Sequence, residues 1–134
     1  MTGRLSVLEE VLYRQIHPNS LQGGVPASDR FRPAPMDDNM LSTDRGSLIT
    51  PEAAHQLFTS SGAMSAAVFG LTVGEFGTEE IQCLEDPVKD DPRRPDNAAH
   101  ALADYSAHDL KKQKLIAKRL LKLAVTRGCL HPVE

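Results

Sequence analysis

The clearest periodic pattern of apolar and polar residues lies near the C-terminal end of the chain, over residues 107–127. Advancing 100° per residue places apolar side chains on one side of a helix and basic side chains on the other. The apolar side consists of Leu110, Ala117, Leu120, Leu121 and Ala124, and the basic side of Lys111, Lys118, Arg119 and Lys122. Ser106 and Asp109 have the spacing of a capping box, and Gly128 supplies an end signal. The pattern predicts an amphipathic helix over 107–127.

A second helix and a buried strand are predicted in the middle of the chain. Thr50 is a favourable N-cap, and Pro51 suits the first helical position, where its missing N–H has no intrahelical partner. The apolar side of this helix consists of Ala54, Leu57 and Phe58. Gly62 follows as the end signal, so we predict a helix over 51–61. Residues 66–73 are almost continuously apolar, which indicates a central strand buried on both faces.

Residues 5–16 fit two different patterns. Ser6 and Glu9 have the spacing of a capping box, and leucines follow at helical intervals. Residues 11–16 also alternate as a strand does, and Pro18 ends either element. We favour one turn of helix followed by a strand and keep the continuous helix as the alternative.

The remaining segments complete a small α+β domain. Residues 40–43 form a strand candidate followed by turn residues at 44–47, and 98–103 are expected to be a strand despite their alanine content. Residues 17–38 are rich in Gly, Pro, Ser and Asp and are read as a long ordered loop, and 85–97 as an exposed loop. We predict one domain over 1–134, with a small mixed sheet of three or four strands packed on one side by two amphipathic helices.

Composition restricts the class of protein more than its activity. Aromatic residues make up 4% of the 134 residues and Trp is absent, so aliphatic side chains must fill the core. No apolar run is long enough to cross a bilayer, and the first residues lack the pattern of a signal peptide. Cys83 and Cys129 are isolated in the sequence, which favours a reducing compartment. We therefore expect a cytoplasmic protein that does not contact membranes.

Charge is distributed unevenly along a chain of net charge −3. The segment 75–104 contains nine acidic and three basic residues, whereas 106–134 contains seven basic and two acidic residues. The two segments either neutralise each other in the fold or leave the basic helix facing a partner. Leu115 projects among the lysines of this helix, which makes it the natural anchor of a binding surface formed with Lys111, Lys118, Arg119 and Lys122.

Candidate chemistry is sparse. The five histidines do not pair with one another or with cysteines at ligand spacing, so no metal site is predicted. Arg14 on a first strand, Ser42-Thr43 on a second and Glu75 after a third resemble the layout of ADP-ribosyltransferase-like enzymes. The resemblance implies NAD as cofactor, with Arg14 on its phosphates, Ser42 at the nicotinamide ribose and Glu75 orienting the reacting hydroxyl. Glu75 lacks the acidic or glutamine residue that the family places two positions away.

A broader resemblance covers most of the chain. It rests on the segments 12–18, 31–33, 41–42 and 50–54, which read LYRQIHP, FRP, LS and TPEAA. With these segments the chain is similar to a family of short uncharacterised bacterial proteins. The resemblance implies a single bacterial domain and no particular activity.

The function that the sequence favours is binding without catalysis. We expect a protein-binding module, of the accessory, immunity or antitoxin kind, that has no cofactor and recognises a protein with an acidic surface. Two alternatives stay open: the NAD-using enzyme with Arg14, Ser42 and Glu75, and a nucleic-acid-binding protein that uses the basic C-terminal helix.

Overall fold

The computed structural model describes residues 3–132. They form three helices and five strands of four to six residues, with three two-residue strands beside them. The helices are α1 (Pro51–Thr59), α2 (Val73–Thr78) and α3 (Leu110–Arg127). The longer strands are β1 (Val11–Ile16), β4 (Met40–Arg45), β5 (Ala67–Thr72), β6 (Gln82–Glu85) and β7 (His100–Asp104), and the short ones are β2 (Leu21–Gln22), β3 (Val25–Pro26) and β8 (His131–Pro132). The α+β class is confirmed.

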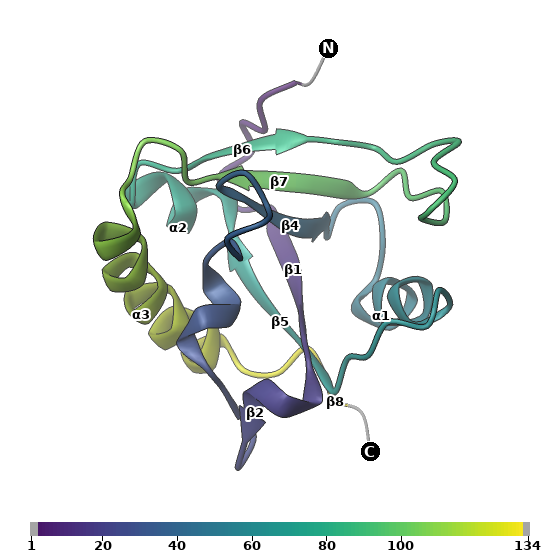
Figure 1. Cartoon of the computed structure of the whole chain (residues 1–134), viewed down its shortest axis with the longest axis horizontal. Helices are drawn as coiled ribbons and strands as arrows, with labels where there is room; N and C mark the ends of the chain where they lie inside the picture. The colour runs from purple at the N-terminus through teal and green to yellow at the C-terminus, as the bar shows by residue number, and fades with distance from the viewer. Residues whose placement is uncertain (1–2, 133–134) are drawn as a thin grey trace.

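The main sheet has the order β6-β7-β4-β1-β5-β8, and every strand pair in it is antiparallel (Figure 1). The predicted mixed sheet of three or four strands was therefore too small. The prediction missed β6, and β5 lies next to the two-residue edge strand β8 rather than at the centre. β1 pairs with β5 along its whole length, but with β4 only at Leu12↔Arg45 and Tyr13↔Asp44. The two strands separate beyond these pairs.

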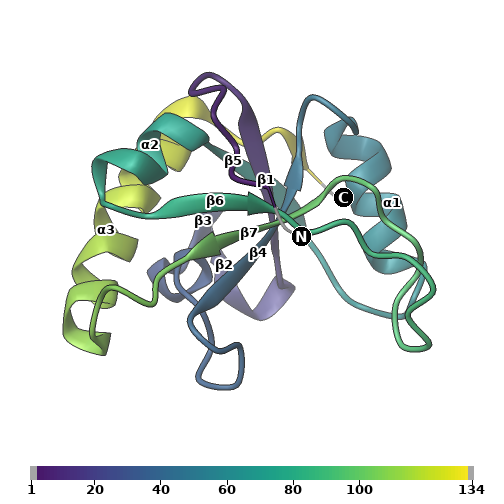
Figure 2. The same cartoon turned by 90° about the horizontal axis from the view of Figure 1, so that it is seen from above.

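The helices cover both faces of the sheet. α2 and α3 lie on one side and α1 on the other (Figure 2), so the prediction of two helices on one side was wrong. The larger core lies under α3 and contains Leu12, Ile16, Leu41, Phe69, Leu71, Ile116 and Leu120 among others. A smaller cluster of Tyr13, Ala54 and Val68 lies under α1. β5 is buried on both faces, as its apolar sequence predicts.

α3 begins three residues later than predicted. Asp109, not Ser106, is the N-cap and accepts a hydrogen bond from the backbone N–H of Lys112 (2.8 Å). Gly128 ends the helix with a φ of 98°, a conformation that glycine adopts without steric cost. Ala117, Leu120 and Ala124 are fully buried as expected, together with Ile116. Leu110 is the first helical residue and is 56% exposed, so its assignment to the core was wrong, whereas Leu121 is half-buried against the core.

Helix α2 was not predicted because its residues continue an apolar run. Thr72 ends β5 and caps α2 by accepting from the backbone N–H of Glu75, whose carboxylate accepts from the N–H of Thr72 in return. This capping box turns the chain out of the sheet. The similar spacing at Ser6 and Glu9 does not start a helix; a turn at Leu8-Glu9 precedes β1. The strand prediction for 11–16 is confirmed.

The remaining local predictions hold with shifted boundaries. The helix predicted over 51–61 ends at Thr59, and Thr50 caps it by accepting from the N–H of Ala53. The strand predicted at 40–43 continues to Arg45, and the turn follows at 46–49. β7 confirms the strand expected in 98–103.

The two predicted loops are ordered in different ways. Residues 17–38 contain β2, β3 and the 3-10 turns Pro18–Ser20 and Ser28–Phe31, and they cover part of α3. Phe31 is fully buried in the larger core. Residues 85–97 are largely exposed, but an antiparallel bridge between Val88 and Asn97 closes them into a loop and buries Val88.

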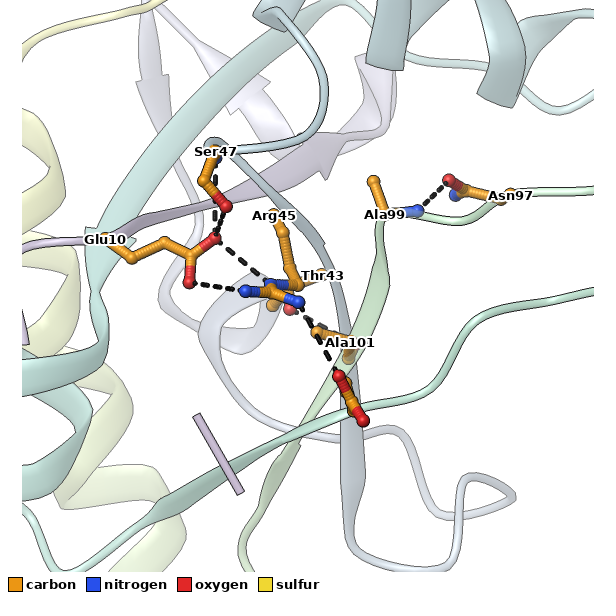
Figure 3. A network of polar contacts seen from close by, with 8 residues as sticks. Glu10, Thr43, Arg45, Ser47, Asn97, Ala99 and Ala101 are labelled. Atoms are coloured by element: carbon orange, nitrogen blue, oxygen red, sulfur yellow. Dashed lines mark hydrogen bonds and ion pairs between the residues drawn. The ribbon is translucent and has the colours of Figure 1, made fainter. Parts of the chain in front are cut away.

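A buried ion pair joins the start of β1 to the end of β4. The Glu10 carboxylate accepts from Arg45 Nε (3.1 Å), from Arg45 Nη2 (3.2 Å) and from the Ser47 hydroxyl (Figure 3). Arg45 Nη1 lies 3.7 Å from Oε2 of Glu85 on β6. Burial alone would raise the pKa of Glu10, but the hydrogen bonds from Arg45 and Ser47 outweigh it and hold this pKa below its usual value.

The two leucines on opposite sides of α3 make a matched pair for a stability test. Leu120→Ala should lower the free energy of unfolding by about 2–5 kcal/mol, because it removes buried methyl groups and leaves a cavity. Leu115→Ala should change it by about 0.5 kcal/mol or less, since Leu115 is exposed. Urea unfolding monitored by circular dichroism measures both values. Equal losses in the two variants would contradict this assignment of the faces.

The Glu10 pair predicts a dependence of stability on pH. Because the pKa of Glu10 is depressed by folding, its contribution is complete above the unfolded value of 4.5 and is lost as the pH falls through the folded pKa. Glu10→Gln should lower the free energy of unfolding at pH 7 by about 1–3 kcal/mol, because it weakens the charge-assisted hydrogen bonds of a partly buried pair. The difference in free energy of unfolding between this variant and the wild type should shrink towards pH 3. Urea unfolding at several pH values tests this, and a pH-independent difference would contradict it.

Candidate functional site

One candidate surface is the outer side of α3. Lys111, Leu115, Lys118 and Lys122 follow one another at intervals of three or four residues and are all exposed; we call this set the lysine stripe. Leu115 is 47% exposed, as the sequence predicts. None of the three lysines makes an ion pair within residues 3–132. The stripe therefore presents positive charge around an apolar side chain.

The arginines of α3 have a different role. Arg119 donates to both carboxylate oxygens of Glu79 (2.8 and 2.7 Å), and Arg127 to both oxygens of Glu75 (2.9 Å each). The hydrogen bond from Arg119 lowers the pKa of Glu79. Arg119, predicted as a partner contact, thus binds a carboxylate of its own chain. The acidic segment neutralises the arginines of the basic helix and leaves the lysines of the stripe unpaired.

A second candidate is a pocket of about 210 Å³ on the opposite face of the sheet, between α1 and the 88–97 segment. Leu57 and Phe58 of α1 form one wall, and Val88 and Pro95 form another. Polar side chains of the sheet line it as well: Tyr13 and Gln15 of β1, Ser42 and Asp44 of β4, and His100 of β7. Arg94 also lines it; its guanidinium is exposed and paired with Asp91 at 3.3 Å. An apolar pocket with a few polar groups is typical of a small-molecule site.

Asp44 is the buried carboxylate of this pocket. It is 8% exposed, and Asn97 Nδ2 donates to its Oδ1 over 2.7 Å. No cation forms an ion pair with Asp44 in the part of the chain that the structure describes. Burial raises the pKa of Asp44, while the Asn97 hydrogen bond and the nearby His100 oppose this rise.

His100 lies beside Asp44, because the two residues are register partners on β4 and β7. Its Nδ1 contacts the backbone oxygen of Asp86 (3.1 Å) and Asp86 Oδ2 (3.0 Å), which are both acceptors. Nδ1 must therefore carry a proton, which it donates to Asp86.

Gln15 adds an unusual feature to the pocket. It is 8% exposed, its Oε1 accepts from the Ser65 hydroxyl (2.7 Å), and its Nε2 is buried without a partner. Ser65 Oγ also lies 3.0 Å from the Ala67 carbonyl, and one hydroxyl proton serves only one of the two acceptors. In the amide orientation turned by 180°, Nε2 donates to Ser65, Ser65 donates to Ala67, and only Oε1 stays unpartnered. In either orientation one polar atom of this amide lacks a partner.

Of the three residues of the ADP-ribosyltransferase-like layout, Arg14 and Ser42 are neighbours that both line the pocket, whereas Glu75 lies apart. Arg14 alternates with Leu12 and Ile16, which lie in the core under α3, whereas Ser42 shares the opposite face of the sheet with Asp44. The Arg14 guanidinium donates to the backbone oxygens of Arg30 (2.6 Å) and Ser42 (3.2 Å). Burial lowers the pKa of Arg14 to about 10.

Glu75 lies away from both. It is in the first turn of α2, where its carboxylate binds Arg127 and the N–H of Thr72, and it does not line the pocket. Burial would raise the pKa of Glu75, but the hydrogen bonds from Arg127 and Thr72 lower it. All three residues therefore have partners that hold the fold together.

Other sites suggested by residue type do not assemble. Residues 3–132 contain no group of three His, Cys, Asp or Glu side chains placed to hold a metal ion. Cys83 and Cys129 are both free thiols, and burial raises the pKa of Cys83 to about 12. Among the helices of the same residues, none is long and apolar enough to cross a membrane.

Sequence analysis missed the pocket for identifiable reasons. Asp44 was read as a turn residue, although it belongs to β4. The alternation along β1 did place Tyr13 and Gln15 on one face and Arg14 on the other, and it was the only signal for this part of the site. Asn97 and His100 reach it through strand pairing with β4, which is not visible from local pattern.

The buried Asp44 predicts a gain in stability on neutralisation. A carboxyl whose pKa is raised by folding loses stabilising free energy as the pH rises through that folded pKa. Asp44→Asn keeps an acceptor for Asn97 and removes the charge, so it should raise the free energy of unfolding at pH 7 by about 1 kcal/mol. The gain should fall towards pH 4. Urea unfolding at both pH values tests this, and a loss of stability at pH 7 would contradict it.

Comparison with protein-family models, with curated proteins and with solved structures found no match to this chain. The resemblance to short bacterial proteins therefore stays a hypothesis. The two features of the molecule that bear on its function are the lysine stripe of α3 and the pocket between α1 and the 88–97 segment.

Proposed function

We propose that this protein is a non-catalytic module that binds another protein through the lysine stripe of α3. The observation that carries the proposal is Leu115, an exposed leucine among lysines without ion-pair partners, on a helix whose opposite side packs on the core through Ile116, Leu120 and Ala124. A solvated helix face has no need of a leucine at its centre. Interfaces commonly combine an apolar anchor with charged residues around it.

The charge of the stripe indicates the chemistry of the partner. Lys111, Lys118 and Lys122 would attract a surface rich in Asp and Glu and speed its association at low salt. Leu115 would enter an apolar depression on that surface. The role we propose is that of an accessory, immunity or antitoxin-like component in the bacterial cytoplasm.

Nucleic acid fits this surface less well. Both arginines of α3, the residue type best suited to bind phosphates through two hydrogen bonds, are occupied by Glu79 and Glu75. The chain as a whole is acidic, and the stripe contains no aromatic side chain for stacking on bases. An exposed leucine has no counterpart in a phosphate backbone.

Leu115→Asp is the variant that tests the proposal. It should abolish capture of the partner from a lysate of the native host, and it should weaken binding of the purified partner at least about 100-fold, as for an interface anchor. Leu48→Asp is the matched control, since Leu48 is also exposed but lies in the turn before α1. Unchanged affinity of the Leu115 variant would overturn the proposal.

Salt dependence provides a separate test. Replacing Lys111, Lys118 and Lys122 by Gln should slow association with the acidic partner and reduce its dependence on ionic strength, with a smaller effect on dissociation. Stopped-flow measurements between 50 and 500 mM NaCl measure this. A gel shift of DNA or RNA that these substitutions eliminate, together with the absence of a protein partner, would favour the nucleic-acid alternative instead.

A further inference from the structure

The pocket between α1 and the 88–97 segment contains a buried carboxylate whose hydrogen bonds are incomplete. Asp44 has one carboxylate oxygen bound to Asn97, and the other accepts no hydrogen bond from residues 3–132. His100 lies beside Asp44, and its Nδ1 is held by Asp86. Gln15 contributes an amide whose unpartnered atom is Oε1 in the orientation that satisfies Ser65 and Ala67. These three groups lie on three adjacent strands and line one pocket.

A buried carboxylate without a counter-ion is unfavourable. Charges removed from water cost several kcal/mol unless they are paired or hydrogen-bonded. Asp44 has one hydrogen bond and no ion-pair partner within the described chain. The two arginines that line the pocket are bound elsewhere, Arg14 to the backbone oxygens of Arg30 and Ser42 and Arg94 to Asp91. Arg45 precedes the turn on the same strand, but its guanidinium is bound to Glu10 on the other face. A ligand that brings a positive charge would supply the missing counter-ion.

The remaining walls define the rest of the ligand. Leu57, Phe58, Val88 and Pro95 are apolar, and the Tyr13 ring lines the pocket as well. Aromatic faces also attract cations. A volume of about 210 Å³ corresponds to roughly seven water molecules at about 30 Å³ each, which fits a ring or short chain bearing one cationic group.

We propose that this pocket binds a small organic cation, a primary amine on a compact apolar body, whose ammonium group donates to the free carboxylate oxygen of Asp44. A primary ammonium brings both the positive charge and the N–H donors that the Asp44 carboxylate lacks. The apolar body lies between Phe58 of α1 and Pro95 of the facing segment. The site is on the opposite face of the sheet from α3, so it does not depend on the proposed protein-binding function.

Three probes of similar size and different charge test the proposal without altering the protein. Benzylamine is cationic, benzyl alcohol is neutral and benzoate is anionic at pH 7.5. Titration calorimetry should give an affinity for benzylamine at least about tenfold above that for benzyl alcohol, with no binding of benzoate. Chemical-shift changes in a parallel NMR titration should be centred on Asp44, His100 and Phe58. Equal affinity for the three probes, preference for benzoate, or shifts centred elsewhere would overturn the proposal.

Single substitutions then test which side chains bind the amine. Asp44→Asn keeps the hydrogen bond with Asn97 and should lower the affinity for benzylamine at least about tenfold, as expected when a charged acceptor is lost. Asp104→Asn is the matched control: it removes a charge from the same face of β7, keeps an acceptor for the N–H of Ser106, and lies outside the pocket. Its affinity should equal that of the wild type. Equal losses in both variants would show a general charge effect and overturn the proposal.

Phe58→Ala keeps the test decisive if Asp44→Asn does not fold. Phe58 is 40% exposed, so its truncation leaves the core intact while removing one wall of the pocket. The affinity for benzylamine should fall several-fold with an unchanged melting temperature. An unchanged affinity would place the amine outside the pocket and contradict the proposal.

Discussion

The fold depends on the buried pair between Glu10 and Arg45. Glu10 precedes β1 and its backbone carbonyl receives the N–H of Val73 at the start of α2, while Arg45 ends β4 and reaches Glu85 on β6. Two ion pairs of Arg45 and one backbone hydrogen bond of Glu10 thus connect segments that are distant in sequence. The pair between Glu10 and Arg45 also fixes the turn after β4, because Ser47 donates to the same carboxylate. Since β1 and β4 share only two register pairs, this contact supplies much of what holds them in place.

The separation of β1 and β4 shapes both sides of the sheet. Beyond Tyr13 the strands no longer pair, and the Arg14 guanidinium fills the gap by donating to the carbonyls of Ser42 and Arg30. Arginine can do this because its planar group carries several donors and stays charged when buried. On the other face Gln15 and Ser42 line the pocket beside the same gap. Arg14, which suggested an NAD site in the sequence, therefore supports the wall of the pocket.

Local signals predicted the elements better than their arrangement. Thr50, Pro51 and Gly128 mark helix ends by chemistry that acts within a few residues, and these predictions hold. The capping box at Thr72 was hidden by the apolar run of β5, while the same spacing at Ser6 has no helix behind it. The exposure of Leu115 followed from helical periodicity. The meeting of Asp44, His100 and Gln15 depends on strand register, which arises from long-range pairing and leaves no local trace.

The sheet has an edge at β6 and another at β5, and short segments from the two ends of the described chain cover both. Residues 3–5 lie along β6, with hydrogen bonds from Leu5 to Cys83 and from Glu85 to Gly3, and β8 pairs with β5. Unpaired edges recruit strands from other molecules. Each covering segment is only a few residues long, and the N-terminal one is also held by Leu5, which is buried in the larger core. Removal of either one, by proteolysis or by an engineered deletion, would expose a template for intermolecular pairing in an otherwise native protein.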